Sequence, residues 1–189
     1  MKEDKQSHKR KWDCGIDFEK EYEKLRFALI SEAKNNIFNN NIKKQKVAIL
    51  LIALRNGSRI GEARNAYNEF IKTNKNEVEV VVEKQGYKRT KKDDGTIEKS
   101  YIPNYRKMVI PIEVKNYGKY ISNDENLCAF SKRFFHYNPH SLRFAFITYL
   151  GKKNYSPAVI AKITKHRSLN MVINYTQEKE AERVLKEII

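Results

Sequence analysis

The chain has 189 residues, of which 40% are hydrophobic, and this length and composition are typical of one globular domain with an ordinary core. Lysine and arginine number 38 and aspartate and glutamate 23, so the formal net charge is 38 − 23 = +15. No fold requires such an excess, which indicates an anionic partner, either nucleic acid or a membrane surface. The longest apolar run, Val47 to Leu54, is far below the roughly 18 residues of a membrane span, so no membrane-spanning segment is expected. Binding to a membrane surface would explain the charge but not the spacing of the charged residues described below, so no membrane partner is expected.

The N-terminus has no hydrophobic segment of the signal-peptide kind. Cys14 and Cys128 are too few and too far apart to indicate a disulfide framework or a metal site, so the cytoplasm is the expected compartment. Residues 1–15 are polar and basic and are predicted to form a flexible tail ahead of one domain over 16–189.

The first predicted helix runs from Ile16 to about Ile37, where apolar residues recur at helical spacing. A more buried helix is predicted from about Lys44 to Arg55, ending at Gly57, which is a natural C-terminal cap. Ser58 is a suitable N-cap for a third helix over about 59–67.

Short β-branched segments follow at 69–73 ("EFIKT"), 77–84 ("EVEVVVEK") and 106–114 ("RKMVIPIEV") and predict a three-stranded antiparallel sheet. A long basic segment joins the last two, and on so basic a chain we expect it to contact DNA rather than to be only a solvated loop. The candidate DNA-binding residues are Lys88, Arg89, Lys91, Lys92 and Lys107. Helices are then predicted at about 124–134, 140–151, 156–164, 168–174 and 178–189, so the fold class is α+β and mostly helical, with one small sheet.

The segment from Asn138 to Leu150 has the composition of a buried helix, apart from His140 and Arg143. Asn138 suits the N-cap and Pro139 the first helical position, which places both residues in the first turn on one face. A helix N-terminus favours anions, and a guanidinium and an imidazole added there make a phosphate site. Arg59 also lies at a predicted helix start and repeats the arrangement; alternatively each arginine pairs with a carboxylate, for instance Arg59 with Glu62.

Ordered motifs along the chain contain these and further charged residues. They are "NGSRIGE" with Arg59 and Glu62, "VVVEKQG" with Lys84, "HSLRFAFITYL" with His140 and Arg143, and "KHRSLNMVINY" with His166 and Tyr175. Together they resemble the catalytic domain of tyrosine recombinases, the family of phage integrases, Xer and Cre. The first, third and fourth are similar to the family's boxes T-G-x-R-x-x-E, H-x-L-R-H-x-F-A-x-x-L and G-H-x-S-x-x-T-x-x-Y, and the second resembles its catalytic-lysine strand.

The chain departs from these motifs at several positions, among them Met171 and Val172, which replace the usual threonines before Tyr175. Phe144 stands where the family often has a second histidine or arginine, and Lys165 replaces the glycine before His166. Residues 1–40 are too few for the separate N-terminal DNA-clamping domain that such enzymes usually carry, so a catalytic domain alone is expected.

The resemblance implies that a tyrosine attacks a DNA phosphodiester, forms a 3′-phosphotyrosine and releases a 5′-hydroxyl, without metal, ATP or another cofactor. A phenol, with a pKa of roughly 10, needs activation for this step. The implied roles are Tyr175 as nucleophile, Arg59 and Arg143 on the non-bridging oxygens, His140 and His166 as hydrogen-bond donors or proton shuttles, Lys84 as the acid for the leaving oxygen, and Glu62 as a support.

Several alternatives remain open at this stage. Lys88, Lys91, Lys92 and Lys107 compete with Lys84 for the role of catalytic lysine. The expected partner is double-stranded DNA, bound by a homo-oligomer between dimer and tetramer. The amphipathic segment after Tyr175 docks either on the next protomer or on its own core. The rival functions are type IB topoisomerase-like strand relaxation and a catalytically inert DNA-binding regulator.

Overall fold

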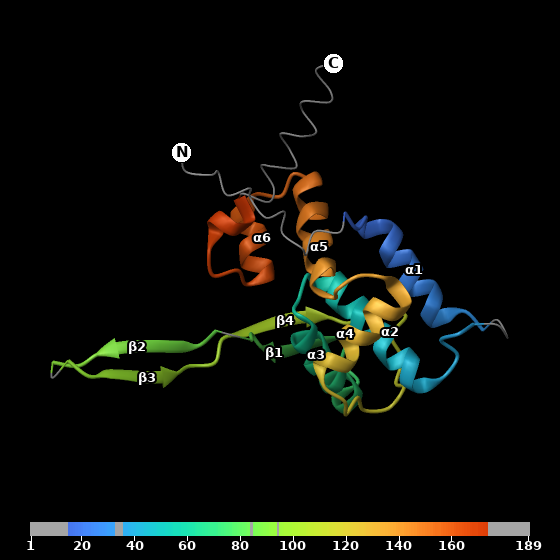
Figure 1. The fold of residues 1–189 in the computed structure, drawn as a ribbon, viewed down its shortest axis with the longest axis horizontal. Coiled ribbons are helices and arrows are strands. Elements are labelled where there is room, and N and C mark those ends of the chain that lie inside the picture. Colours follow the sequence, from blue (N-terminus) through green and yellow to red (C-terminus); the bar gives the residue numbers. More distant parts are fainter. Residues whose placement is uncertain (1–14, 33–35, 84, 94, 174–189) are drawn as a thin grey trace, which may run out of the picture.

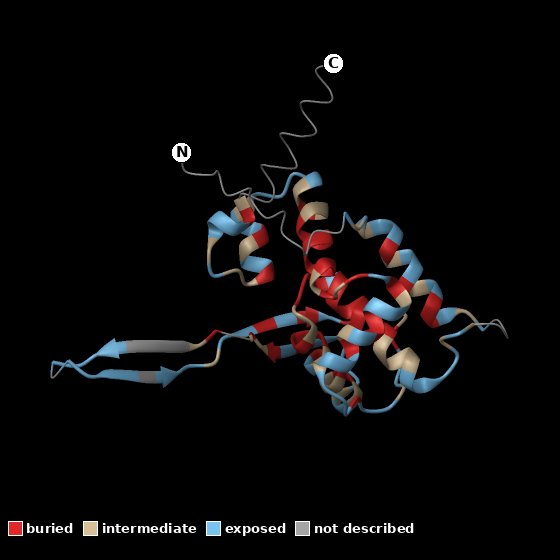
Figure 2. Ribbon diagram, viewed as in Figure 1, coloured by how far each residue is buried: buried red, intermediate tan, exposed pale blue. Residues whose placement is uncertain are grey.

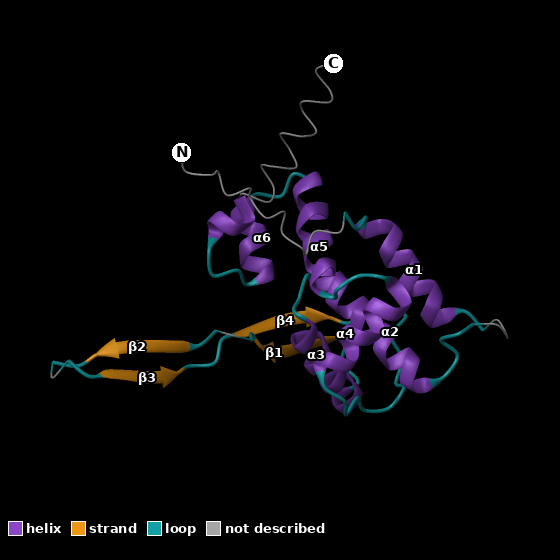
Figure 3. Cartoon of the chain, in the orientation of Figure 1, coloured by secondary structure: helices purple, strands orange, loops and turns teal. Residues whose placement is uncertain are grey.

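The computed structural model describes residues 15–32, 36–83, 85–93 and 95–173. The predicted basic tail, the predicted helix over 178–189, Lys84 and Tyr175 lie outside these residues. The elements in chain order are α1 (Phe18–Ile30), α2 (Asn41–Asn56), α3 (Ile60–Thr73), β1 (Glu77–Val81), β2 (Tyr87–Lys91), β3 (Ile97–Tyr101), β4 (Tyr105–Val109), α4 (Asp124–Phe135), α5 (His140–Lys152) and α6 (Pro157–Thr164). A further helical segment covers 169–173. Figure 3 shows this mostly helical α+β architecture, which confirms the predicted fold class.

Helix α2 lies at the centre of the hydrophobic core. All eight residues from Val47 to Leu54 have no exposed surface, so the helix is covered on every side. A helix that is apolar all round has this central position, and α1, α3 and α5 pack against it (Figures 1 and 2).

Gly57 ends α2 and sets the approach of the neighbouring helices. It has a left-handed backbone conformation (φ 54°), which favours glycine, and its N–H bonds to carbonyls of the last turn. A Cβ at this position would overlap the ring of Phe146 in α5. The glycine therefore lets α5 lie against the turn between α2 and α3, which carries Arg59.

The predicted three-stranded sheet is wrong in its number of strands, because residues 69–73 form the last turn of α3. The apolar residues Ala63, Ala66, Tyr67 and Phe70 recur at helical spacing, and all four are buried. The β-branched Thr73 fits the helix end, where its hydroxyl donates to the carbonyl of Glu69 (2.8 Å). Helical burial thus outweighs the local strand propensity of these residues.

The other two predicted strands pair as expected, and the basic segment between them forms a second pair. β1 and β4 are antiparallel, with Val80 opposite Arg106, and β2 and β3 form their own antiparallel ladder. A tight turn around Gly95 (φ 83°) joins β2 to β3. Figure 1 shows this β2–β3 hairpin projecting away from the helical body, and Figure 2 shows that its described surface is largely exposed.

In the described part of the chain, no helix combines the length and the apolar character needed to cross a membrane.

Candidate active site

Arg143, in the first turn of α5, is almost completely enclosed. Only 1% of its surface is exposed. Its Nη1 donates to the carbonyl of Gly57 and its Nη2 to the carbonyl of Thr164, both at 2.8 Å. The guanidinium therefore ties the end of α2 to the end of α6 and holds its own position with two buried bonds.

His166 lies directly against Arg143, so the structure brings together two residues that are 23 positions apart. Both ring nitrogens are 3.2 Å from Arg143 Nη2, and Nδ1 is 2.6 Å from the Thr164 hydroxyl. That hydroxyl is also 2.6 Å from the carbonyl of Ile160, which can only accept. The single hydroxyl proton must point at this carbonyl, so Nδ1 of His166 carries the ring proton and Nε2 is an acceptor.

The charge state of His166 follows from its surroundings. Burial lowers the pKa of His166, and the positive charges of Arg143, Arg59 and other neighbours lower it further, to about 3. The imidazole is therefore neutral at pH 7.

Glu62 links Arg59 to a third arginine, Arg106, which the sequence did not single out. The Glu62 carboxylate has no exposed surface and accepts from Arg59 Nη1 at 2.9 Å and from Arg106 Nη1 at 3.2 Å. It also accepts from the backbone N–H groups of Arg59 and Glu83. The signal for Arg106 was present in β4, where it shares the buried face of the strand with Met108.

The start of α3 differs in detail from the prediction. Arg59 itself is the N-cap residue, and the Glu62 carboxylate satisfies its backbone N–H. Within the described residues, no group hydrogen-bonds the buried hydroxyl of Ser58, so Ser58 is not the cap. The expected pairing of Arg59 with Glu62 is present, yet Arg59 keeps 23% of its side chain exposed.

The junction that these residues form is electropositive. Three guanidinium groups, of Arg59, Arg106 and Arg143, lie around the carboxylate of Glu62. The carboxylate of Glu83 is close enough to Glu62 and Arg59 to interact with both, so the balance is +3 − 2 = +1. Burial and the nearby Arg59 lower the pKa of Arg143 to about 9, which still leaves it charged at pH 7. An uncompensated positive charge beside a neutral histidine is a suitable environment for a phosphate group.

His140 lies at the N-terminus of α5, where its backbone N–H bonds to the side chain of Asn138 (3.0 Å). The helix begins at His140, with Pro139 rather than Asn138 as the N-cap residue. His140 is close enough to His166 to contribute to its lowered pKa, and its ring packs edge-on against Phe144 (5.0 Å between centroids). Arg59, His140, Arg143 and His166 therefore converge on one junction between α2, α3, α5 and α6.

The residue at position 165 explains why the family motif has glycine there. Lys165 ends α6 in a left-handed backbone conformation (φ 53°, ψ 47°) that glycine adopts without strain. Its carbonyl accepts a 2.6 Å hydrogen bond from the side chain of Gln85, the residue after Lys84. The structure thus connects the segment next to Lys84 with the turn that carries His166.

The predicted DNA-binding residues lie in the β2–β3 hairpin and in β4. Lys88 and Arg89 belong to β2, while Lys91 and Lys92 are exposed near the hairpin tip. Lys92 pairs with Glu98 across the hairpin at 3.3 Å. Lys107 is exposed in β4, on the strand that also carries Arg106.

A groove of about 470 Å³ runs between β4, the end of α2 and α6. Of the described residues that line it, five are cationic and none is acidic: Arg55, Arg106, Lys107, Lys162 and Lys165. We refer to these five residues as the basic groove. Two of its residues also adjoin the candidate active site, since Arg106 bonds to Glu62 and Lys165 precedes His166.

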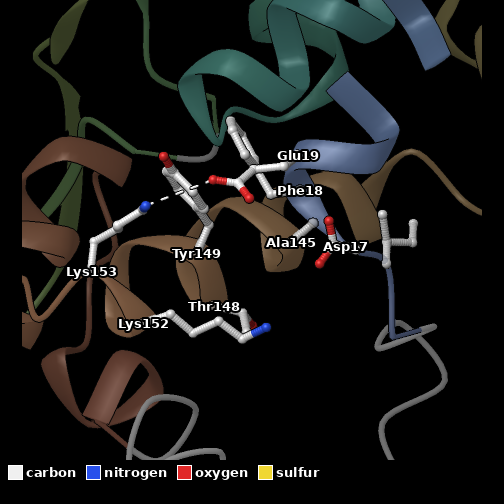
Figure 4. Close-up of a pocket in the computed structure, with 9 residues that line it drawn as sticks. Asp17, Phe18, Glu19, Ala145, Thr148, Tyr149, Lys152 and Lys153 are labelled. Carbon is white, nitrogen blue, oxygen red and sulfur yellow. Dashed lines mark ion pairs between the residues drawn. The ribbon is translucent and has the colours of Figure 1, made fainter. Parts of the chain in front are cut away.

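A second, smaller pocket of about 180 Å³ lies between the start of α1 and the second half of α5 (Figure 4). Its charges are mixed, with Glu19 paired to Lys153 at 3.7 Å, and it contains none of the predicted site residues. In the described ranges, no three histidine, cysteine, aspartate or glutamate side chains gather as a possible metal site.

Comparison with known proteins gives related sequences and a related fold. No protein-family model matches the chain. It is 36% identical to "Putative integrase ORF241" of the Acidianus two-tailed virus, over 94% of this chain and 68% of that protein. It is also 32% identical to protein MJ0770 of Methanocaldococcus jannaschii, over 96% of this chain and 90% of that protein.

Among solved structures, the fold is similar to that of the XerH site-specific recombinase bound to its difH substrate, with a TM-score of 0.52 and 17% identity. The match covers 88% of this chain and 51% of XerH, so the chain spans about half the length of that recombinase. The sequence relatives and this shared fold agree with the motifs around Arg59, Arg143 and His166. The chain therefore belongs to the tyrosine recombinase (integrase) family.

Proposed function

We propose that this chain is a site-specific recombinase that cleaves and rejoins double-stranded DNA through a 3′-phosphotyrosyl intermediate on Tyr175. The observation that carries the proposal is the contact between Arg143 and His166 at an electropositive junction with Arg59. The charge of this junction suits the phosphate, and its neutral imidazole suits proton transfer.

In this mechanism the Tyr175 hydroxyl attacks the phosphorus atom, and the bond to the 5′-oxygen of the next nucleotide breaks. Arg59 and Arg143 stabilise the negative charge that develops on the non-bridging oxygens. Because Arg143 is 1% exposed, a phosphate reaches its guanidinium only after the side chains around it move. Catalytic groups often reach their final hydrogen-bonding geometry only when the substrate is bound.

The protons in this reaction need a base and an acid. His140 offers one imidazole near the phosphate. His166, whose pKa is about 3, is a weak base in the free chain, and it can take the phenol proton only when the negative charge of a bound phosphate raises its pKa. Lys84 would donate a proton to the leaving 5′-oxygen. The reverse reaction, with a 5′-hydroxyl from another strand, rejoins the DNA without ATP because the phosphodiester energy is kept in the phosphotyrosine.

DNA is the partner that best accounts for the surfaces around the junction. The β2–β3 hairpin presents Lys91 and Lys92, and the basic groove presents further cations. Contacts of this kind to phosphates position a duplex without reading its sequence. We place the activity in the cytoplasm and expect a homo-oligomer, from dimer to tetramer, to assemble on the DNA.

A covalent-trapping assay tests the proposal. Wild type, Tyr175→Phe and the control Tyr155→Phe are incubated with nicked, end-labelled duplexes carrying candidate sites, and the products are separated on denaturing gels. Tyr155 is a suitable control because it is exposed (52%) and belongs to no motif. We expect an adduct with wild type and with the control, and none with Tyr175→Phe.

Other outcomes separate the rival functions. If all three proteins bind DNA and none forms an adduct, the chain is a DNA-binding regulator rather than an enzyme. If the adduct forms and supercoiled plasmids are relaxed processively without strand exchange, the activity is that of a type IB topoisomerase.

A further inference from the structure

Gln85 makes a buried connection between two parts of the chain that are eighty residues apart. Gln85 is only 8% exposed, and its side-chain Nε2 donates to the carbonyl of Lys165 at 2.6 Å. Its Oε1 accepts from the side chain of Asn104 at 2.9 Å. Both ends of the amide are therefore satisfied, which fixes its orientation.

The support for this amide comes from the base of the β2–β3 hairpin. The carbonyl of Asn104 accepts from the N–H of Val82 (2.7 Å), and the carbonyl of Gly86 accepts from the N–H of Ile102 (2.8 Å). Gly86 has a positive φ of 99°, and a Cβ there would lie against the backbone of Ile102. Gln85 thus lies where backbone hydrogen bonds join the two sides of the hairpin base, and there a side chain is held more precisely than on a free loop.

The acceptor of the Gln85 hydrogen bond, the carbonyl of Lys165, belongs to the 164–166 turn, which contributes Thr164 and His166 to the candidate active site. Lys165 lies between Thr164, whose carbonyl accepts from Arg143, and His166, whose ring contacts Arg143. Lys165 has a left-handed backbone that a non-glycine residue adopts at a cost, so surrounding contacts must hold it. The hydrogen bond from Gln85 to its carbonyl is such a contact.

We propose that Gln85 is a positioning residue for DNA cleavage, which holds the 164–166 turn so that the His166 ring stays against Arg143. This proposal rests on the proposed recombinase function only for its catalytic consequence; the structural tie between residues 85 and 165 stands apart from it. Because the tie begins at the base of the β2–β3 hairpin, it also couples the placement of the hairpin to that of His166.

The test uses Gln85→Glu, which keeps the shape and the acceptor for Asn104 but loses the donor and places a carboxylate against the Lys165 carbonyl. Gln45→Glu is the matched control, since Gln45 also donates from Nε2 to backbone carbonyls, of Tyr117 (2.7 Å) and Gly118 (3.1 Å), near the opposite end of α2. Hydrogen exchange of the peptide covering 161–168 and the single-turnover rate of adduct formation are measured for both variants and wild type.

We expect Gln85→Glu to raise exchange at the amides of the 164–166 turn, with little change in α2, and to slow adduct formation about 10- to 100-fold with DNA affinity largely kept. Gln45→Glu should change neither quantity. Unchanged exchange in Gln85→Glu overturns the tie, and faster exchange with an unchanged cleavage rate overturns the positioning role. Absence of an adduct from wild type contradicts the proposed function instead, and the exchange experiment still decides the tie.

Discussion

The carboxylate of Glu62 should be one of the most sensitive positions for stability, because it is the shared acceptor of two arginines. It is fully buried and accepts four hydrogen bonds, two of them from guanidinium groups at 2.9 and 3.2 Å. Arg106, its second partner, keeps only 3% of its side chain exposed, so it cannot turn to solvent when the carboxylate is removed. Arg59, with 23% exposed, can do so more easily.

The magnitude follows from this difference in burial. Breaking a buried ion pair by removing one partner typically costs about 3–5 kcal/mol, and we expect Glu62→Ala to lie in this range because Arg106 is left charged and buried. Glu62→Gln keeps one acceptor oxygen and should cost less, about 1.5–3 kcal/mol. Either loss is large against the roughly 5–15 kcal/mol by which a domain is stable.

Urea unfolding at pH 7 measures both losses as shifts in the midpoint at constant slope. Glu23→Gln is the control, since Glu23 forms an exposed pair with Arg26 and its removal should change the midpoint little. The variant Glu62→Gln/Arg106→Met should recover part of the loss, because the unpaired charge is removed with its partner. A loss below about 1 kcal/mol for Glu62→Ala would refute the view that this carboxylate holds the two arginines.

Three further outcomes follow from the site and the hairpin. The pKa of His166 is about 3 in the folded chain and about 6.5 when unfolded. The unfolded chain therefore binds a proton first, so the contribution of the neutral His166 to stability is present above pH 6.5 and is lost as the pH falls toward 3. The difference in urea midpoint between wild type and His166→Gln, measured across this pH window, should show that loss. Lys165→Gly should remove the left-handed strain and raise stability by up to about 1 kcal/mol in thermal melts, after the larger chain entropy of glycine is subtracted, while weakening DNA binding through the lost charge. Replacing Lys91 and Lys92 by alanine should weaken binding equally for all sequences and flatten the log–log salt dependence of the affinity by about 2, with unchanged melting.

Features that depend on one short segment of the chain could be predicted from the sequence. The apolar run 47–54, the terminating Gly57 and the motifs with Arg143 and His166 each lie within one short segment, and the structure confirms the buried helix and its C-terminal cap. The catalytic roles of the site residues stay predictions, and Tyr175 and Lys84 also lie outside the described part of the chain.

Features that depend on distant partners were not visible in the sequence. The alternation in β4 marks Arg106 as buried, but its partner carboxylate lies 44 positions earlier, and Gln85 bonds to a carbonyl 80 positions later. No local pattern therefore shows which groups these two residues contact. The β2–β3 ladder was missed for a different reason. None of the strand residues whose burial is described is buried, and the pairing depends on the backbone and the turn at Gly95 rather than on alternating hydrophobic residues.

In the proposed function, Arg143 would be held ready for an anion. Its bonds to the carbonyls of Gly57 and Thr164 fix the guanidinium without cancelling its charge, whereas a carboxylate would do both. The retained charge is unfavourable in a side chain that is 1% exposed, and the lowered pKa of Arg143, about 9, reflects that burial and the nearby Arg59. A phosphodiester at this junction would supply the missing negative charge, so its binding should stabilise the contacts among α2, α5 and α6. By linkage, the same contacts favour the binding of the phosphodiester.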